Sequence, residues 1–443
     1  MSDNGNDSNF DGEGLDPQDF EAFMREFLEK GAAGMDVEKL AAAAGLPNDP
    51  AQLAAMLSQL RSALNQSNPD GSAVNWKLAS DQARQLAAAN SSAISEDVRK
   101  QLSDALAIAT LWLNQATQIS ELTQEPKMLS RELWVQDAMP LFQALSSPVA
   151  ERMSVALSES LQANAPEELS GVLSNATSMM RSMGGALFAM QLGQSLGKLS
   201  TEVLTGGDIG LPIFAEQRAA FLTQNLEAYI NELDVETDQV LIYLAVRELA
   251  HARLFKQSKW LREHVINQIT QYAAEIKIDT DRIQELTRDF DPNDTAALQQ
   301  AFQSGAFIAA RNEEQGRALE SIENILALIE GWVDAITDQA TALLPKSIAI
   351  GEAVRRRRAS GGPAEKTFGT LIGLELRPRR LREAATLWRE IGHRLGNEKR
   401  DALWNHPDLL PTAEEIVNPE LLFARLDGGS DNFDKELRDL LGE

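Results

Sequence analysis

Apolar residues recur along most of the chain at the three-to-four-residue spacing of an α-helix. One clear example follows Ser95, where Val98, Leu102, Ala105 and Ala109 lie on one helical face. A serine directly before such a stripe is a typical helix N-cap. Alternating runs of β-branched residues, which would predict strands, are scarce. The pattern therefore predicts an all-α or nearly all-α protein.

The same pattern divides the chain into a helical body and flanking parts. Residues 1–16 are polar and acidic, which predicts a disordered tail. Residues 17–66 hold two short amphipathic patterns and predict a helical appendage, separated by turn residues from a main domain over 67–427. Residues 428–443 are acidic and rich in turn formers, and they predict a second flexible tail.

Two local features modify the helical pattern. Pro140 and Pro148 interrupt residues 129–157, which predicts two or three separate helices there. Further along, small residues recur every fourth position and form a ridge on one helix face, which predicts a close helix–helix contact in the core. The members of this ridge are Gly185, Ala189, Gly193 and Gly197.

Composition restricts the classes of partner and compartment. The 443 residues are 43% hydrophobic, and 66 acidic against 41 basic residues give a net charge of −25. Such a charge argues against nucleic acid and anionic membranes as partners. The absence of cysteine excludes disulfides and thiolate metal ligands. The chain begins without a signal-peptide pattern and has no long apolar run, so we expect a cytoplasmic protein.

The apolar helical stretch over residues 240–255 carries the most informative polar residues, Arg247, Glu248 and His251. Zinc peptidases often use His-Glu-x-x-His on a helix, with two imidazole ligands one turn apart and the glutamate as general base. Here the first position is arginine, which stays protonated and has no lone pair for a metal. A second Arg-Glu-x-x-His occurs at 389–393, so the pattern by itself has low specificity.

Residues 243–255, which read YLAVRELAHARLF, resemble the active helix of the zincin-like hydrolase family of actinobacteria. Members are labelled zinc-dependent metalloproteases, and some are described as associated with the biosynthesis of a deazaflavin cofactor. The resemblance covers roughly residues 72–425. It continues through the segments TGGDIGLP (205–212), LIEGWVD (328–334), GGPAEKTF (361–368), LIGLELRPRRL (371–381) and WNHPDLLP (404–411).

The resemblance implies a site in which Glu248 is the general base, His251 the second zinc ligand and Glu330 the third. Two positions depart from the family pattern. Arg247 replaces the first ligand, and Trp332 stands where family members have the histidine of a Glu-Gly-His segment. Zinc therefore remains a possible cofactor, but these departures argue against tight binding and against peptidase activity.

The departures suggest a compensation inside the site. The Arg247 guanidinium could form paired hydrogen bonds with Glu330 or Asp334 and so replace the charge of the metal. Two functions remain open: a metallopeptidase-like hydrolase, or a non-catalytic scaffold for an unknown protein or peptide partner. A minor alternative is a di-iron carboxylate protein, in which Glu248/His251 and Glu390/His393 would be the two Glu-x-x-His pairs.

A basic segment over residues 355–382 contrasts with the acidic chain. It has nine lysines and arginines against Glu365 and Glu375. One interpretation is an internal ion-pair network with the many carboxylates. The other is a binding site for an anion or an acidic peptide.

Overall fold

The structure is a computed structural model that describes residues 74–89, 91–163, 170–216, 218–279, 309, 312–359, 363–374 and 380–427. All of them belong to one compact unit, formed by residues 63–289 and 298–443. The predicted tails at 1–16 and 428–443 and the predicted appendage at 17–66 lie outside the described residues.

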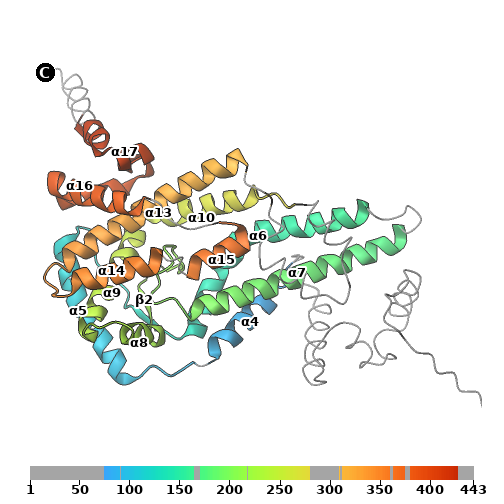
Figure 1. The fold of residues 1–443 in the computed structure, drawn as a ribbon, viewed down its shortest axis with the longest axis horizontal. Coiled ribbons are helices and arrows are strands. Elements are labelled where there is room, and N and C mark those ends of the chain that lie inside the picture. Colours follow the sequence, from blue (N-terminus) through green and yellow to red (C-terminus); the bar gives the residue numbers. More distant parts are fainter. Residues whose placement is uncertain are drawn as a thin grey trace, which may run out of the picture. The chain divides into compact units, whose positions relative to one another are not determined.

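Helices make up most of the described chain, which confirms the prediction of a nearly all-α fold (Figure 1). The one sheet among the described residues pairs two short parallel strands, with Lys127 opposite Ala220. No helix in the described ranges is long and apolar enough to cross a membrane. The elements are α4 (Trp76–Ala88), α5 (Glu96–Ala116), β1 (Lys127–Leu129), α6 (Arg131–Ala163), α7 (Ser170–Ser200), β2 (Ala220–Leu222), α8 (Thr223–Asn231), α9 (Thr237–Gln257), α10 (Lys259–Ala274), α13 (Glu313–Ala340), α14 (Ser347–Ala359), α15 (Pro363–Ile372), α16 (Leu381–Ala402), the 3-10 turns Leu403–Asn405 and Pro407–Leu409, and α17 (Ala413–Val417).

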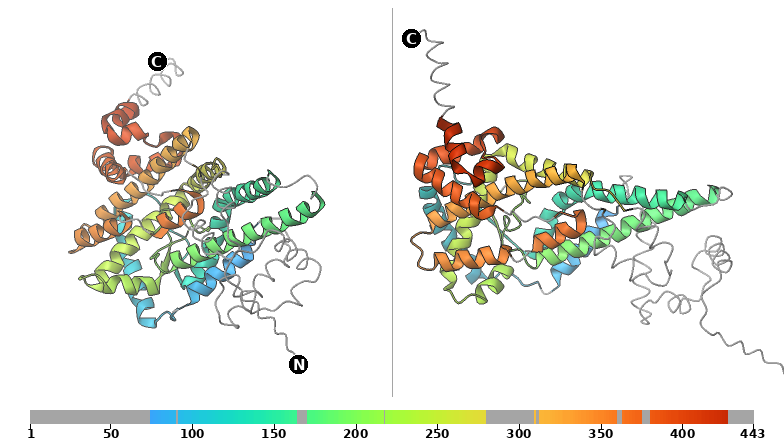
Figure 2. Two further views of the ribbon diagram at one scale, coloured as in Figure 1. Left: turned by 45° about the vertical axis from the view of Figure 1, so that its right-hand side comes forward. Right: turned by 45° about the horizontal axis from the view of Figure 1, so that its top comes forward.

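Helix α13 lies at the centre of the packing around the candidate site. It contacts α5, α9, α10 and α16, and α9 and α16 lie on different sides of it (Figures 1 and 2). Its first turn is fixed by a capping box between Asn312 and Gln315, which satisfies backbone N–H groups at the helix start. Every residue from Ile325 to Thr337 is buried. Polar side chains on this stretch must therefore find partners inside the protein.

Helix α5 begins as predicted, because the Ser95 hydroxyl accepts a hydrogen bond from the Val98 N–H at 3.2 Å. The predicted break in the next helix is wrong, since α6 continues through Pro140 and Pro148. A proline inside a helix costs about 3 kcal/mol. Trp134 and Phe142 are fully buried where α6 packs on α4, α7 and α10. Each large apolar side chain buried in this way contributes about 1.5 to 3 kcal/mol, so packing outweighs the two prolines.

The ridge of small residues on α7 makes the predicted close contact, and its partner is α4. A Cβ atom built on Gly193 would lie 2.8 Å from the Ala79 carbonyl oxygen, and one on Gly197 would lie 2.7 Å from Leu86 Cβ. Both distances are shorter than van der Waals contact. The two helices can therefore approach this closely only because these positions lack side chains.

We predict that Gly197→Ala lowers the free energy of unfolding by about 1 to 3 kcal/mol, because the added methyl group overpacks the α4–α7 contact. Urea unfolding followed by circular dichroism measures this change. Gly316→Ala is the matched control, since a Cβ at Gly316 meets no atom within 4 Å. That control should leave stability unchanged or raise it by up to about 1 kcal/mol. Equal effects of the two substitutions would contradict the packing explanation.

Candidate functional site

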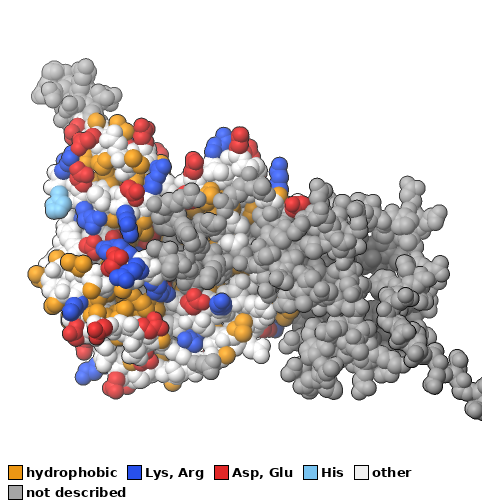
Figure 3. Space-filling view, viewed as in Figure 1, with side chains coloured by type: hydrophobic (Ala, Val, Ile, Leu, Met, Phe, Trp, Pro, Cys, Tyr) orange, Lys and Arg blue, Asp and Glu red, His pale blue; other side chains and the backbone are white. Residues whose placement is uncertain are grey.

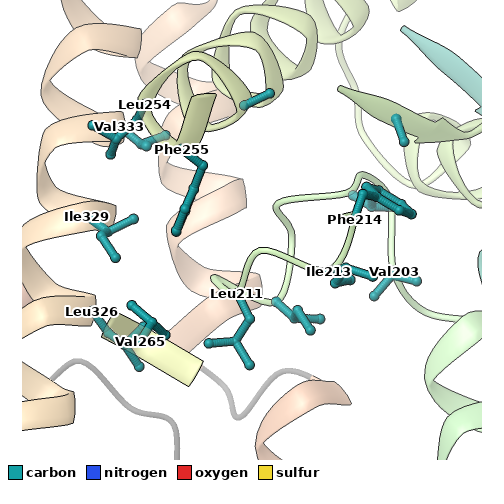
Figure 4. Packing of buried hydrophobic residues seen from close by; sticks show 14 of the residues in the cluster. Val203, Leu211, Ile213, Phe214, Leu254, Phe255, Val265, Leu326, Ile329 and Val333 are labelled. Atoms are coloured by element: carbon teal, nitrogen blue, oxygen red, sulfur yellow. The ribbon is translucent and has the colours of Figure 1, made fainter. Parts of the chain in front are cut away.

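Helix α9 carries the candidate residues through the interior of the protein. Every residue from Val240 to Phe255 is buried except Arg247, which is half-buried. Figure 4 shows Leu254 and Phe255 of this helix beside Ile329 and Val333 of α13, with the loop residues Leu211, Ile213 and Phe214 on the other side. Four ionisable side chains therefore lie within or against an apolar core: Arg247, Glu248, His251 and Arg253.

Arg247 is paired with two carboxylates of α13. Its Nη2 lies 2.5 Å from Glu330 Oε2, and its Nη1 lies 3.7 Å from Asp334 Oδ1. Glu330 and Asp334 lie one helical turn apart and therefore face the same way. The side chains of Glu330 and Arg247 are only 2% and 12% exposed. One hydrogen bond of the predicted pair is therefore present, to Glu330, and the contact with Asp334 is an ion pair without a hydrogen bond. Both contacts lie where solvent screens them weakly.

Arginines of α14 complete this cluster. Arg358 Nη2 lies 2.9 Å from Glu330 Oε1, so an arginine nitrogen faces each oxygen of Glu330. Arg355 lies 3.2 Å from Asp334 and 3.0 Å from Asp338. On the face drawn in Figure 3, acidic and basic side chains intermingle over α14 and α16 and do not form one basic patch. For Arg355 to Arg358, the contacts favour the internal ion-pair network over an anion site.

The loop over residues 205–212 is attached to α9 through Glu248. The Gly207 N–H donates to Glu248 Oε2 at 2.8 Å, and the Ala220 N–H donates to Oε1 at 2.9 Å. A Cβ on Gly207 would lie 2.6 Å from His251 Cγ, so only glycine allows the loop backbone this close. Both oxygens of the predicted general base thus accept backbone hydrogen bonds. Its catalytic role stays a prediction.

Burial shifts the pKa values of Glu248, the predicted general base, and His251, the predicted zinc ligand, so that the neutral form of each is favoured. It raises the pKa of Glu248 to about 7, although the hydrogen bonds from Ala220 and Gly207 act in the opposite direction. Burial also lowers the pKa of His251 to about 4; nearby Glu330 opposes this shift, and the charges of Arg358 and Arg247 add to it. The imidazole is therefore neutral near pH 7.

Glu248 and His251 line a small cavity together with Phe214, Arg218 and other residues of α9 and the loop. Its volume of about 20 Å³ is enough for roughly one water molecule. The His251 Nε2 atom is buried and has no hydrogen-bond partner among the described residues. Pockets for small molecules usually have about 300 Å³ or more, so this cavity is too small for a peptide substrate.

The residues present do not match the donor set of a zinc enzyme. Such a site takes three protein ligands from histidine and carboxylate side chains. Arg247 adds a cation instead, and both Glu330 oxygens already face arginine nitrogens. Trp332 points towards α16, where its indole N–H donates to Asp401 at 3.1 Å. The described ranges contain no group of three or more His, Asp or Glu side chains placed to hold a metal ion.

The second Arg-Glu-x-x-His pentad lies apart from the first. On α16, Glu390 pairs with Arg394 at 2.6 Å, and His393 lines a different pocket between α13 and α16. The di-iron alternative needs both Glu-x-x-His pairs around one centre. Since no such metal-binding group exists in the described part of the chain, that alternative is wrong for these residues.

Sequence reasoning missed two partners in this region. Arg358 forms a second ion pair with Glu330, and Arg357 pairs with Asp208 in the loop at 2.8 Å. The available signals were the run of four arginines at 355–358 and the aspartate inside the glycine-rich loop. Neither signal identifies its partner without the fold.

Comparisons with known proteins place the chain in a family. Residues 74–422 match the model of the zincin-like metallopeptidases. A search of curated proteins gave no match. Among solved structures, a suspected hydrolase with a novel fold from Chloroflexus aurantiacus is similar, with a TM-score of 0.54 and 16% identity over 80% of this chain and 99% of that chain. That likeness shows a shared fold, and the match over residues 74–422 shows that the chain belongs to the zincin-like metallopeptidase family.

Proposed function

We propose that this chain is a non-catalytic member of its family, in which the Arg247–Glu330 ion pair takes the place of a zinc centre. The observation that carries the proposal is the 2.5 Å contact between Arg247 Nη2 and Glu330 Oε2 inside the protein. A guanidinium there supplies positive charge to the carboxylate and offers no lone pair to a metal. The retained fold then serves to bind a protein or peptide partner.

The hydrogen bonds that Glu248 accepts support the same proposal. A general base needs an oxygen directed at the water or group that it deprotonates. In this chain both Glu248 oxygens accept hydrogen bonds from backbone N–H groups, those of Gly207 and Ala220. The role that fits these contacts is to anchor the loop over residues 205–212 on α9.

One observation favours the hydrolase alternative. His251 Nε2 is buried without a described partner beside Glu248, in a cavity of about 20 Å³, and a water held there would contact both polar side chains. In that alternative, Glu248 and His251 would activate this water. A substrate would require the loop over residues 205–212 to move.

A peptide-cleavage assay separates the two functions. The native protein, with added zinc and with a chelator, is incubated with a mixed peptide library and the products are identified by mass spectrometry. We expect no cleavage above that of a Glu248→Gln variant. Cleavage by the native protein that Glu248→Gln abolishes would overturn the non-catalytic proposal.

A further inference from the structure

A larger pocket lies between α13 and α16, and Asp338 on its wall is also bound by Arg355 of the Arg247 cluster. Its volume is about 310 Å³, which is within the range of pockets that hold small molecules. We call it the α13–α16 pocket. Its lining residues are Ala335, Asp338, Gln339, Arg389, Gly392, His393, Asn397 and Arg400.

The second pentad supplies one wall of this pocket. Arg389 and His393 lie four residues apart on α16, so both point to the same side of the helix, and both line the pocket. Glu390 turns away and pairs with Arg394. The pentad thus places two nitrogen-bearing side chains in the pocket and keeps its carboxylate out.

Two glycines of α16 shape the pocket. Gly396 has φ +84° and interrupts the helix, so that Asn397 and Arg400 return towards Gly392. A Cβ on Gly392 would lie 3.1 Å from Arg400 Nη1. The missing side chain at Gly392 therefore leaves the Arg400 guanidinium accessible from the pocket.

Arg400 is held rigidly at the buried end. Its side chain is 2% exposed and pairs with Asp401, while Nη2 donates to the Ala116 carbonyl and Nη1 donates to Gln339 at 3.1 Å. A guanidinium has five N–H groups. The bonds to described residues use Nε–H, both Nη2–H groups and one Nη1–H. One N–H of Nη1 thus stays available at the pocket wall.

The charges of the lining favour an anion. Arg389 and Arg400 contribute two positive charges against one negative charge from Asp338. Asp338 already accepts hydrogen bonds from Arg389 and Arg355. Asp401 neutralises part of the Arg400 charge through its contacts with Nε and Nη2, and it does not line the pocket. His393 and Asn397 add groups that can donate.

We propose that the α13–α16 pocket binds a small organic anion with a carboxylate or phosphate group. Arg400 holds the anionic group from the buried end of the pocket, and Arg389, His393 and Asn397 hold it from the exposed side. The site does not rest on the proposed non-catalytic function, because the pocket and the Arg247 cluster have only Asp338 in common, and Asp338 is not one of the groups that hold the anion.

Isothermal titration calorimetry of the full chain tests this at constant ionic strength, with phosphate and citrate as separate probes and glycerol as the neutral control. We expect one or both anions to bind and glycerol not to bind. Tighter binding of phosphate or of citrate shows whether the pocket prefers a phosphate or a carboxylate group. Absence of binding by both anions up to the solubility limit of the protein–probe mixture would overturn the proposal.

Matched variants locate the binding site. Arg389→Gln should weaken anion binding about tenfold, because it removes one charge-assisted hydrogen bond. Arg394→Gln on the same helix is the control, since Arg389 and Arg394 are both 44% exposed and only Arg389 lines the pocket. Gly392→Ala should also weaken binding without changing any charge. If Arg389→Gln and Arg394→Gln weaken anion binding equally, the anion responds to the overall surface charge and not to the pocket, and the proposal is overturned.

Nuclear magnetic resonance of the histidine rings gives a readout that does not depend on these variants folding normally. Phosphate or citrate should shift the imidazole signals of His393 in the native protein and leave those of His406 unchanged. His406 is the control because it is 62% exposed and lies outside the pocket. Equal shifts of both rings would contradict binding at this site.

Discussion

Replacing Arg247 with methionine should lower the free energy of unfolding by about 3 kcal/mol. Removing one partner of a buried ion pair typically costs about 3 to 5 kcal/mol, because it leaves the other charge buried. Glu330 is 2% exposed and loses its 2.5 Å contact. Arg358 and Arg355 still face Glu330 and Asp334 in the variant. We therefore expect the lower end of that range, measured by urea unfolding near pH 7.

The control for this prediction is Arg356→Met on α14. Arg356 pairs with Glu352 at 3.4 Å, but its side chain is 75% exposed. Exposed ion pairs contribute about 0 to 1 kcal/mol. If the Arg247 and Arg356 variants lose the same stability, the Arg247 cluster is not the buried network described here.

The effect of Glu248→Gln on the free energy of unfolding should depend on pH. The ionised carboxylate of Glu248 accepts hydrogen bonds from the backbone N–H groups of Gly207 and Ala220, whereas the glutamine amide places an –NH₂ donor against one of these two groups. A buried donor left without an acceptor costs about 1 to 3 kcal/mol. The pH dependence of this loss comes from the pKa of Glu248, because glutamine does not titrate.

The sign of the pH dependence follows from the raised pKa. Burial raises the pKa of Glu248 from 4.5 to about 7, so the native state binds an extra proton between these values. This contribution to stability is complete below pH 4.5 and is lost as the pH rises through 7. At 1.36 kcal/mol per pH unit, the free energy of unfolding of the native protein, relative to that of the variant, should fall by about 3 kcal/mol over that interval. A difference that stays constant with pH would contradict the assigned shift.

The fold was predictable where local patterns determine it. The stripe after Ser95 and the glycine ridge on α7 correctly predicted a helix start and a close helix contact. The break expected at Pro140 and Pro148 was wrong because burial along α6 outweighs the proline cost. The strands β1 and β2 have three residues each, which is too short for an alternating pattern.

The site was predictable only in part. The substitution of arginine for a metal ligand predicted the contact between Arg247 and Glu330, although they are 83 positions apart. The pair of Arg357 with Asp208 spans 149 positions, and no periodicity links them. The hydrogen bonds that anchor Glu248 were also missed. Their donors are backbone N–H groups, which every residue except proline has, so the sequence does not indicate which of them bind Glu248. Tertiary packing alone decides these partners.

The two Arg-Glu-x-x-His pentads show how little such a pattern determines. On α9 the arginine pairs with Glu330 of a neighbouring helix, and the glutamate binds the loop backbone. On α16 the arginine and the histidine line a pocket, and the glutamate pairs with Arg394. The same residues at the same spacing therefore take different roles, set by the elements packed against each helix.

Zinc content after reconstitution tests the central claim most directly. The native protein and an Arg247→His variant are incubated with zinc, dialysed extensively and measured by elemental analysis. The variant restores an imidazole at the first ligand position, beside His251 and Glu330, and should retain more zinc than the native chain. We expect the native protein to retain far less than a stoichiometric amount. Stoichiometric zinc that stays bound to the native protein through dialysis would contradict the replacement of the metal by Arg247.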